Sequence, residues 1–170
     1  MPGRLIIFCG IPGSGKTTVA RLVAQADPGA VHIQTDAFRG MIAGPTFSAA
    51  ESEFVYGAAI AAAREALDAD RTVILDATFG SSRRRERTVA ALAGHYSNVR
   101  FVHVVCDLRT ALGRNSARRG AAVVPEEKLV DILGHFEEPP GALRVDSTRD
   151  PRECADQVIR TLLYPLVPPE

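Results

Sequence analysis

A glycine-rich stretch near the N-terminus has the residue types and spacing of a phosphate-binding loop. Residues 10–17 read Gly-Ile-Pro-Gly-Ser-Gly-Lys-Thr and match the Walker A pattern G-x-x-x-x-G-K-[ST] at every defined position. Glycines let the backbone curl so that successive N–H groups and the start of a following helix point at one anion. In this pattern the lysine reaches the β- and γ-phosphates, and the threonine hydroxyl ligates Mg²⁺. The predicted nucleotide site comprises Gly10, Pro12, Gly13, Ser14, Gly15, Lys16, Thr17 and Thr18.

Two aspartates end apolar stretches that we expect to be strands. Asp36 follows residues 31–35, and Asp76 closes residues 72–76. The carboxyl ends of parallel strands face the ligand crevice, so both carboxylates should lie near the γ-phosphate. Asp36 is placed to take the proton of an attacking hydroxyl as a general base, whereas Asp76 has the Walker B arrangement that holds Mg²⁺. Capping of the following segment is the alternative for each aspartate.

Arginines around the second and third expected strands suit an anionic acceptor. Arg39 comes three residues after Asp36, where it would bind the acceptor or the phosphoryl group in transit. Residues 81–87 open a helix with a positive patch in which Arg83 or Arg84 is nearest the strand end. Solvated surface arginines are the alternative in both cases.

A third group of arginines precedes a glycine that interrupts the expected helical pattern. Arg114 and Arg118 are four residues apart, a spacing that places two side chains on one helical face, and Gly120 follows. Residues 112–124 therefore resemble a small lid that closes over ATP and brings at least one guanidinium group to the phosphates. Plain solvated arginines are again the alternative.

The apolar pattern predicts the elements that must position these side chains. Apolar, β-branched runs are expected to form strands at residues 4–9, 31–35, 72–76, 99–106 and 142–145. Helical periodicity is expected at residues 15–26, 48–69, 82–94, 107–118, 125–137 and 151–163. This alternation is typical of a five-stranded parallel sheet with helices on both faces, a three-layer α/β/α P-loop NTPase fold. We expect residues 1–170 to form a single domain.

Composition excludes several other classes of protein. The 170 residues are 46% hydrophobic with a formal net charge of zero, so a polynucleotide would have to be held by a local patch. No apolar run approaches the roughly 20 residues of a membrane span, and no signal peptide is evident, so a cytoplasmic location is expected. Three cysteines at wide spacings suggest neither a disulfide framework nor a zinc site. Of the four histidines, His103 is expected to be a packed side chain, and none is assigned a role.

The rest of the chain narrows the reaction class. GTPases, ATPases and kinases share the Walker A motif, so the motif alone predicts a nucleotide and no particular reaction. The sequence lacks the Asn-Lys-x-Asp motif of GTPases and is short for a mechanical ATPase. What remains is a kinase that uses ATP and Mg²⁺ to phosphorylate a hydroxyl acceptor. A regulatory module that hydrolyses ATP slowly is the alternative, and the sequence does not determine the oligomeric state.

These motifs together resemble the small P-loop kinases of the polynucleotide 5′-kinase type and the AAA-domain-like predicted kinases. The resemblance covers residues 4–140 and lies in GIPGSGKTT at 10–18, TDAFRG at 35–40, TVILDATF at 72–79, LGRNSARR at 112–119 and VPEE at 124–127. It implies an adenylate-kinase-like fold with a small lid. It also implies Lys16 and Thr17 on ATP·Mg²⁺, Asp36 as general base, Arg39 on the acceptor phosphate, and Arg114 or Arg118 on the ATP phosphates.

One position departs from that resemblance. Polynucleotide kinases often have asparagine after Asp-Ala-Thr, where this chain has Phe79. The same framework is also similar to chloramphenicol phosphotransferase and zeta toxin, which modify small molecules. The acceptor therefore stays open between a small molecule and the 5′-hydroxyl of a nucleic acid.

Overall fold

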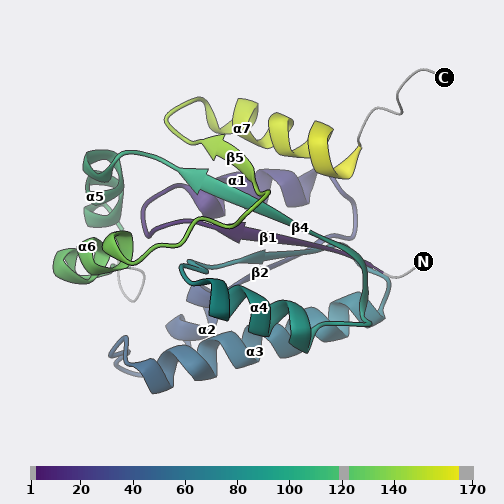
Figure 1. The fold of residues 1–170 in the computed structure, drawn as a ribbon, viewed down its shortest axis with the longest axis horizontal. Helices are drawn as coiled ribbons and strands as arrows, with labels where there is room; N and C mark the ends of the chain where they lie inside the picture. Colours follow the sequence, from purple (N-terminus) through teal and green to yellow (C-terminus); the bar gives the residue numbers. More distant parts are fainter. Residues whose placement is uncertain (1–2, 119–122, 165–170) are drawn as a thin grey trace.

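Five parallel strands form the centre of the molecule. The computed structural model describes residues 3–118 and 123–164. The strands run in the order β2-β3-β1-β4-β5 (Figure 1). Their bounds are β1 Gly3–Cys9, β2 Val31–Gln34, β3 Val73–Asp76, β4 Tyr96–Val105 and β5 Leu143–Asp146. The predicted five-stranded parallel sheet is confirmed, with β4 beginning three residues earlier than the apolar pattern indicated.

Helices cover both faces of this sheet (Figure 1). Their bounds are α1 Lys16–Gln25, α2 Thr35–Gly40, α3 Ala49–Asp68, α4 Ser82–Ala91, α5 Leu108–Ser116, α6 Glu126–Gly134 and α7 Pro151–Val158, with a π-helical turn at Ile159–Leu163. Helices α1 and α7 pack on one face, whereas α3 and α4 pack on the other. Helices α5 and α6 lie beyond the carboxyl ends of the strands, over a small apolar cluster of their own. The three-layer α/β/α architecture is thus confirmed.

Strand β1 is buried on both sides because it lies in the middle of the sheet. Its side chains alternate, so Ile6 and Phe8 enter the core beneath α1 and α7, while Leu5 and Ile7 enter the core beneath α3. This double burial explains why the strand is a continuous apolar run with no polar alternation. It also fixes the position of the loop that follows, at residues 10–15.

Helix α2 is an element that the sequence analysis did not predict. It begins directly where β2 ends, and the Gln34 side chain at its N-cap makes no capping hydrogen bond. Six residues are too few to show a helical period in the sequence. The helix places Asp36 in its first turn and Arg39 one turn later, on the side that meets the other strand ends.

The segment expected to form a lid is described only in part. Helix α5 ends at Ser116, and α6 begins at Glu126. Gly120, on which the expectation partly rested, lies outside the described residues, as do its neighbours at 119, 121 and 122. At the described ends of the segment, the Asn115 side chain donates to the Val124 carbonyl at 2.7 Å and accepts from the Val124 N–H at 3.1 Å. Within residues 3–118 and 123–164, no helix is both long and apolar enough to cross a membrane.

Candidate active site

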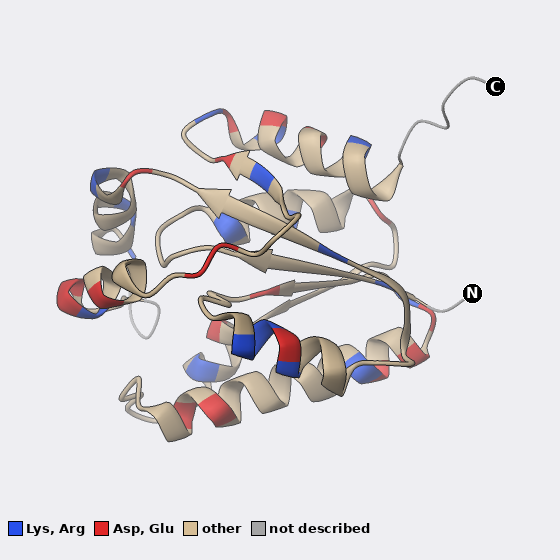
Figure 2. Ribbon diagram, viewed as in Figure 1, with Lys and Arg blue, Asp and Glu red and all other residues tan. Residues whose placement is uncertain are grey.

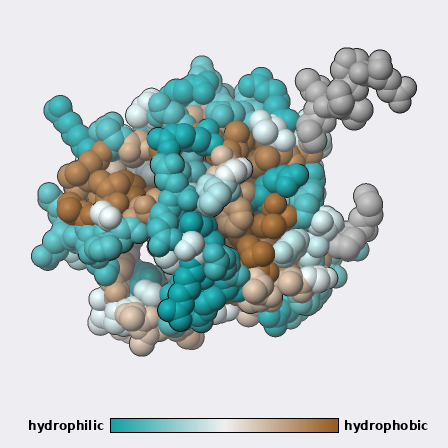
Figure 3. All heavy atoms as spheres, in the orientation of Figure 1, coloured by the Kyte–Doolittle hydropathy of each residue, from teal (hydrophilic) through white to brown (hydrophobic). Residues whose placement is uncertain are grey.

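A cavity of about 500 Å³ lies at the carboxyl ends of the strands. It is bounded by the loop after β1, by α2 and α3, and by α4 and α6. Figure 3 shows the molecule hollowed between its α5–α6 side and its α2–α3 end. The residues that the sequence singled out and that line the cavity are Pro12, Lys16, Thr17, Asp36, Arg39, Asp76, Arg84 and Arg118. The fold therefore brings most of the predicted site residues to one place.

The loop after β1 fits a phosphate group. Gly13 and Gly15 have φ angles of 81° and 90°, and a Cβ atom at Gly13 would lie 2.2 Å from the carbonyl oxygen of Ala111. The Oγ atom of Ser14 is buried without a hydrogen-bond partner among the described residues. A buried polar atom of this kind costs free energy unless a ligand satisfies it. These features fit an anion held by the loop.

Lys16 is a buried cation in the same loop. Its Nζ atom donates to the carbonyl oxygen of Ile11 at 2.9 Å. Burial lowers the pKa of Lys16, and the carboxylates of Asp76 and Asp36 oppose that shift. An anionic phosphate placed beside Lys16 would stabilise its charged form in the same way.

Thr17 and Asp76 meet at the predicted metal position. The Thr17 hydroxyl donates to Oδ2 of Asp76 at 2.7 Å, and Asp76 is only 3% exposed. Hydroxyl and carboxylate oxygens are ligands that suit Mg²⁺, which takes its other ligands from phosphates and water. Across the described residues, no group of three or more His, Cys, Asp and Glu side chains could hold a metal. The hydroxyl of Thr17 and the carboxylate of Asp76 fit a magnesium ion.

His32 is a neighbour of the predicted metal position that the sequence analysis missed. Its Nε2 atom lies 3.3 Å from Oδ2 of Asp76. Strands β2 and β3 are paired in register, with His32 opposite Ile74 and Gln34 opposite Asp76. This proximity depends on the pairing of two strands that are about 40 residues apart in the chain. No local pattern around His32 indicates it.

Asp36 lies at the mouth of the cavity. Its side chain is 51% exposed, and its Oδ2 atom is 3.9 Å from Nη1 of Arg118. Capping of α2 does not account for Asp36, because the N-cap residue is Gln34. The carboxylate is thus accessible to a hydroxyl group that enters the cavity.

Arg39 is held in place by Glu51, a residue to which the sequence analysis gave no role. The two side chains form an ion pair, and the Arg39 guanidinium lies 4.8 Å from the centre of the Phe47 ring. Glu51 also accepts hydrogen bonds from the N–H groups of Thr46, at 2.6 Å, and Phe47, at 3.2 Å. The Ser48-x-x-Glu51 spacing is a capping-box signal for the start of α3, and the Ser48 side chain does accept from Glu51 N. That signal predicts the helix start and not the pairing with Arg39.

Of the arginines at the start of α4, Arg84 is the one that lines the cavity. Its guanidinium lies 4.5 Å from the centre of the Tyr56 ring and pairs with Glu53. Arg83 is exposed and does not line the cavity. Figure 2 shows that the first turns of α4 are mainly basic, with an acidic segment at Glu86 between Arg85 and Arg87. Among the arginines of the predicted patch, Arg84 is thus the one that lines the cavity.

Arg114 and Arg118 do not share one helical face. Helix α5 ends at Ser116, so Arg118 lies beyond it and faces Asp36. Arg114 instead donates to the Ser147 hydroxyl at 2.9 Å and to the Ser147 carbonyl at 2.8 Å. It lines a smaller hollow of about 130 Å³ together with Gly15 and Thr18. The two arginines therefore stand on different sides of the phosphate-binding loop.

Phe79 occupies a special backbone position. Its φ angle is 46°, in the left-handed region that asparagine tolerates better than most other residues. The ring is fully buried and meets Tyr56 edge to face at 5.2 Å between centroids. The hydroxyl oxygen of Tyr56 accepts a hydrogen bond from Phe79 N at 3.2 Å. Phenylalanine at this position therefore contributes to the core despite an unfavourable backbone conformation.

The parallel sheet and the glycine-rich loop after β1 together define a protein with the P-loop kinase fold. The chain belongs to the AAA domain family, whose model matches residues 5–139. No curated protein matches the chain.

Solved structures share this fold over most of the chain. A sugar kinase from Janibacter sp. HTCC2649 is 22% identical, with 96% of each chain covered and a TM-score of 0.74. The Mycobacterium tuberculosis APS kinase CysC, solved with AMPPNP and APS, is 22% identical, with 95% of this chain and 98% of that chain covered and a TM-score of 0.77. A chain of the Pnkp1/Rnl/Hen1 RNA repair complex is 25% identical over 84% of this chain and 49% of that chain, with a TM-score of 0.62.

Proposed function

We propose that the protein is an ATP-dependent kinase that transfers the γ-phosphoryl group of ATP to a hydroxyl acceptor. One observation carries the proposal. The accessible carboxylate of Asp36 and the buried ammonium of Lys16 line the same cavity, next to the Thr17–Asp76 pair. A protein that only bound a nucleotide would not need an accessible base on the far side of the phosphate site.

In this proposal, the nucleoside of ATP lies on one side of the loop and its γ-phosphate on the other. The hollow beside Arg114, Gly15 and Thr18 would receive the nucleoside end. The phosphates would lie over the loop and the start of α1, where backbone N–H groups and the helix dipole favour negative charge. Thr17 and Asp76 would hold Mg²⁺, which neutralises phosphate charge when bound. The γ-phosphate would then enter the larger cavity beside Lys16.

In the reaction that we propose, the acceptor oxygen attacks the γ-phosphorus of ATP. A new O–P bond forms, the bond from the γ-phosphorus to the β–γ bridging oxygen breaks, and ADP leaves. Asp36 takes the proton of the attacking hydroxyl. Lys16, Arg39 and Arg118 stabilise the charge on the phosphoryl oxygens, which is the main source of catalysis in phosphoryl transfer.

The similar structures support kinase chemistry with two kinds of acceptor. One is a sugar kinase and another is an APS kinase, both enzymes that act on small molecules. The third belongs to an RNA repair complex. A small molecule and the 5′-hydroxyl of a nucleic acid are therefore the two acceptor types to test.

A transfer experiment with γ-labelled ATP tests this function. The purified chain is incubated with Mg²⁺ and 5′-hydroxyl DNA, 5′-hydroxyl RNA or a panel of hydroxylated metabolites, and labelled products are separated. We expect label on one acceptor, and no label with the Lys16→Ala variant. Label that appears only as inorganic phosphate would contradict the proposal and would favour a regulatory module that hydrolyses ATP.

A further inference from the structure

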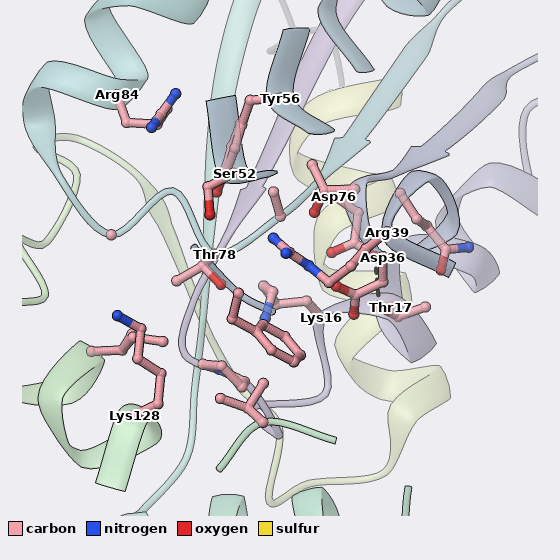
Figure 4. Close-up of a pocket in the computed structure, with 18 of the residues that line it drawn as sticks. Lys16, Thr17, Asp36, Arg39, Ser52, Tyr56, Asp76, Thr78, Arg84 and Lys128 are labelled. Atoms are coloured by element: carbon pink, nitrogen blue, oxygen red, sulfur yellow. Dashed lines mark hydrogen bonds between the residues drawn. The ribbon is translucent and has the colours of Figure 1, made fainter. Parts of the chain in front are cut away.

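The end of the cavity away from the phosphate-binding loop is lined by two cationic side chains. Arg84 projects from α4 and Lys128 from α6, so they enter from different helices. Figure 4 shows both at the side opposite Lys16 and Thr17, with Thr78 between. Neither side chain is needed for the phosphates of ATP in the arrangement proposed above.

Arg84 is held in position by its neighbours, but its positive charge is only partly neutralised by them. The Tyr56 ring lies under its guanidinium, and Glu53 pairs with it. The same carboxylate also accepts from Arg87 at 3.2 Å. Two guanidinium groups therefore share one carboxylate, so Glu53 does not fully neutralise Arg84. Asp131 is the carboxylate that lines this end of the cavity, beside Lys128. Arginine held in this way is preorganised to bind a carboxylate or a phosphate group.

Lys128 supplies a second, less constrained charge. Its Nζ atom lies 4.0 Å from Oδ2 of Asp131, which is also 3.2 Å from His135. The Lys128 side chain is half exposed, so its contact with Asp131 contributes little and can be exchanged for a ligand. Between the two cations and Lys16, the cavity presents the hydroxyl-bearing residues Ser52 and Thr78.

The dimensions of the cavity suit a small molecule. Its volume of about 500 Å³ includes the space for the γ-phosphate and falls within the range of roughly 300–1,000 Å³ for small-molecule sites. A polynucleotide is held by a groove with cations along its backbone. Here the cations Lys16, Arg39, Arg84, Arg118 and Lys128 line a single cavity.

We propose that the acceptor is a small hydroxylated molecule that carries an anionic group, and that Arg84, assisted by Lys128, binds this group. The inference rests on the proposed kinase function. The acceptor hydroxyl lies at Asp36, and its carboxylate or phosphate lies between α4 and α6. Arg84 then determines specificity and takes no part in activating ATP.

Binding of inorganic phosphate tests this site without knowledge of the acceptor. The ATP site is first filled with AMPPNP·Mg²⁺, and phosphate is then titrated by calorimetry. We expect one phosphate site in the wild-type chain, weakened about 10- to 100-fold by Arg84→Gln, as expected for a lost charge-assisted hydrogen bond. Arg84→Lys should recover part of the affinity, and the exposed neighbour Arg83→Gln serves as the matched control. Absence of a phosphate site, or equal affinity in the Arg84→Gln and Arg83→Gln variants, overturns the inference.

Transfer kinetics separate this inference from the proposed function. The acceptors are compared in matched pairs, glucitol with gluconate and ribose with ribose 5-phosphate, alongside a 5′-hydroxyl oligonucleotide. We expect the anionic member of a pair to be phosphorylated with the higher kcat/KM, and Arg84→Gln to raise its KM while the KM for ATP stays unchanged. Transfer to neutral sugars or to the oligonucleotide with equal efficiency overturns the inference but leaves the kinase function standing. Absence of transfer from ATP to any acceptor contradicts the kinase function, whereas the phosphate titration still decides the site.

Discussion

The hydroxyl of Thr17 donates to the carboxylate of Asp76 at 2.7 Å and so joins the first turn of α1 to the end of β3. The two residues are 59 positions apart in the chain. They meet because β1 and β3 are adjacent and in register, with Phe8 opposite Asp76. One pairing of strands thus places both predicted Mg²⁺ ligands beside the phosphate-binding loop.

Replacement of Lys16 by alanine should strongly reduce phosphoryl transfer and leave the fold intact. Loss of a charge that stabilises the transition state typically lowers turnover by about 10²–10³-fold. The hydrogen bond from Lys16 to Ile11 is lost, but so is the cost of burying the ammonium, so the thermal midpoint should move little. A transfer assay and circular dichroism check both expectations. Activity within tenfold of wild type would contradict the assignment of the loop.

Asp36→Asn should lower turnover by roughly 10²–10⁴-fold, the effect of a lost general base, while ATP affinity stays nearly unchanged. Calorimetric titration with AMPPNP·Mg²⁺ measures the affinity. Asp76→Asn is the comparison, because loss of the predicted Mg²⁺ ligand should weaken nucleotide binding. If ATP affinity falls in step with turnover in Asp36→Asn, the residue serves the metal and not the proton transfer.

Arg114→Ala and Arg118→Ala should have different kinetic effects, because the two side chains stand on opposite sides of the loop. Arg114 lies beside Gly15 and Thr18, so its loss should raise the Kd for ATP. Arg118 faces Asp36 in the larger cavity, so its loss should lower kcat with little change in that Kd. Titration and steady-state kinetics distinguish the two. Equal effects of both variants on Kd would show that the arginines act together, as their spacing in the sequence predicted.

The contribution of Glu51 to stability should depend on pH. Hydrogen bonds, first from the Thr46 backbone, and the charge of Arg39 hold the pKa of Glu51 below its usual 4.5. A carboxyl whose pKa is lower in the folded state stabilises the protein above the unfolded pKa, and this stabilisation is lost as the pH falls through the folded pKa. Glu51→Gln should therefore lower the free energy of unfolding at pH 7, and the gap to wild type should shrink below about pH 4.5. Urea unfolding at several pH values measures it, and a gap independent of pH would contradict the mechanism.

Phe79→Ala should destabilise the protein by about 3–5 kcal/mol, because it leaves a cavity in a fully buried site. Phe54→Ala is the matched control, since Phe54 is 62% exposed and its loss should change stability by no more than about 0.5 kcal/mol. Urea unfolding compares the two. A similar effect of both variants would contradict a packing role for the Phe79 ring.

The core elements of the fold were predictable because their signals are local. The run at 4–9 is apolar without alternation, which is what a strand buried on both faces requires. The loop after it carries glycines where the backbone has positive φ angles and a Cβ atom would clash. The short helix α2 had no such signal, and the end of α5 at Ser116 separated two arginines that a longer helix would have aligned.

The sequence by itself determined the phosphate-binding loop, the parallel sheet and the aspartates at the strand ends, because glycine conformation, apolar runs and strand direction are properties of neighbouring residues. Only the tertiary structure decided which partners those residues have. Glu51 holds Arg39, Glu53 and Tyr56 hold Arg84, and His32 approaches Asp76. These contacts join different elements of the fold, and long side chains such as arginine reach whichever carboxylate the packing brings near. The end of the cavity at Arg84 and Lys128 is lined by residues of α3, α4 and α6. Which charged groups line it could therefore be read only from the way these three helices pack together.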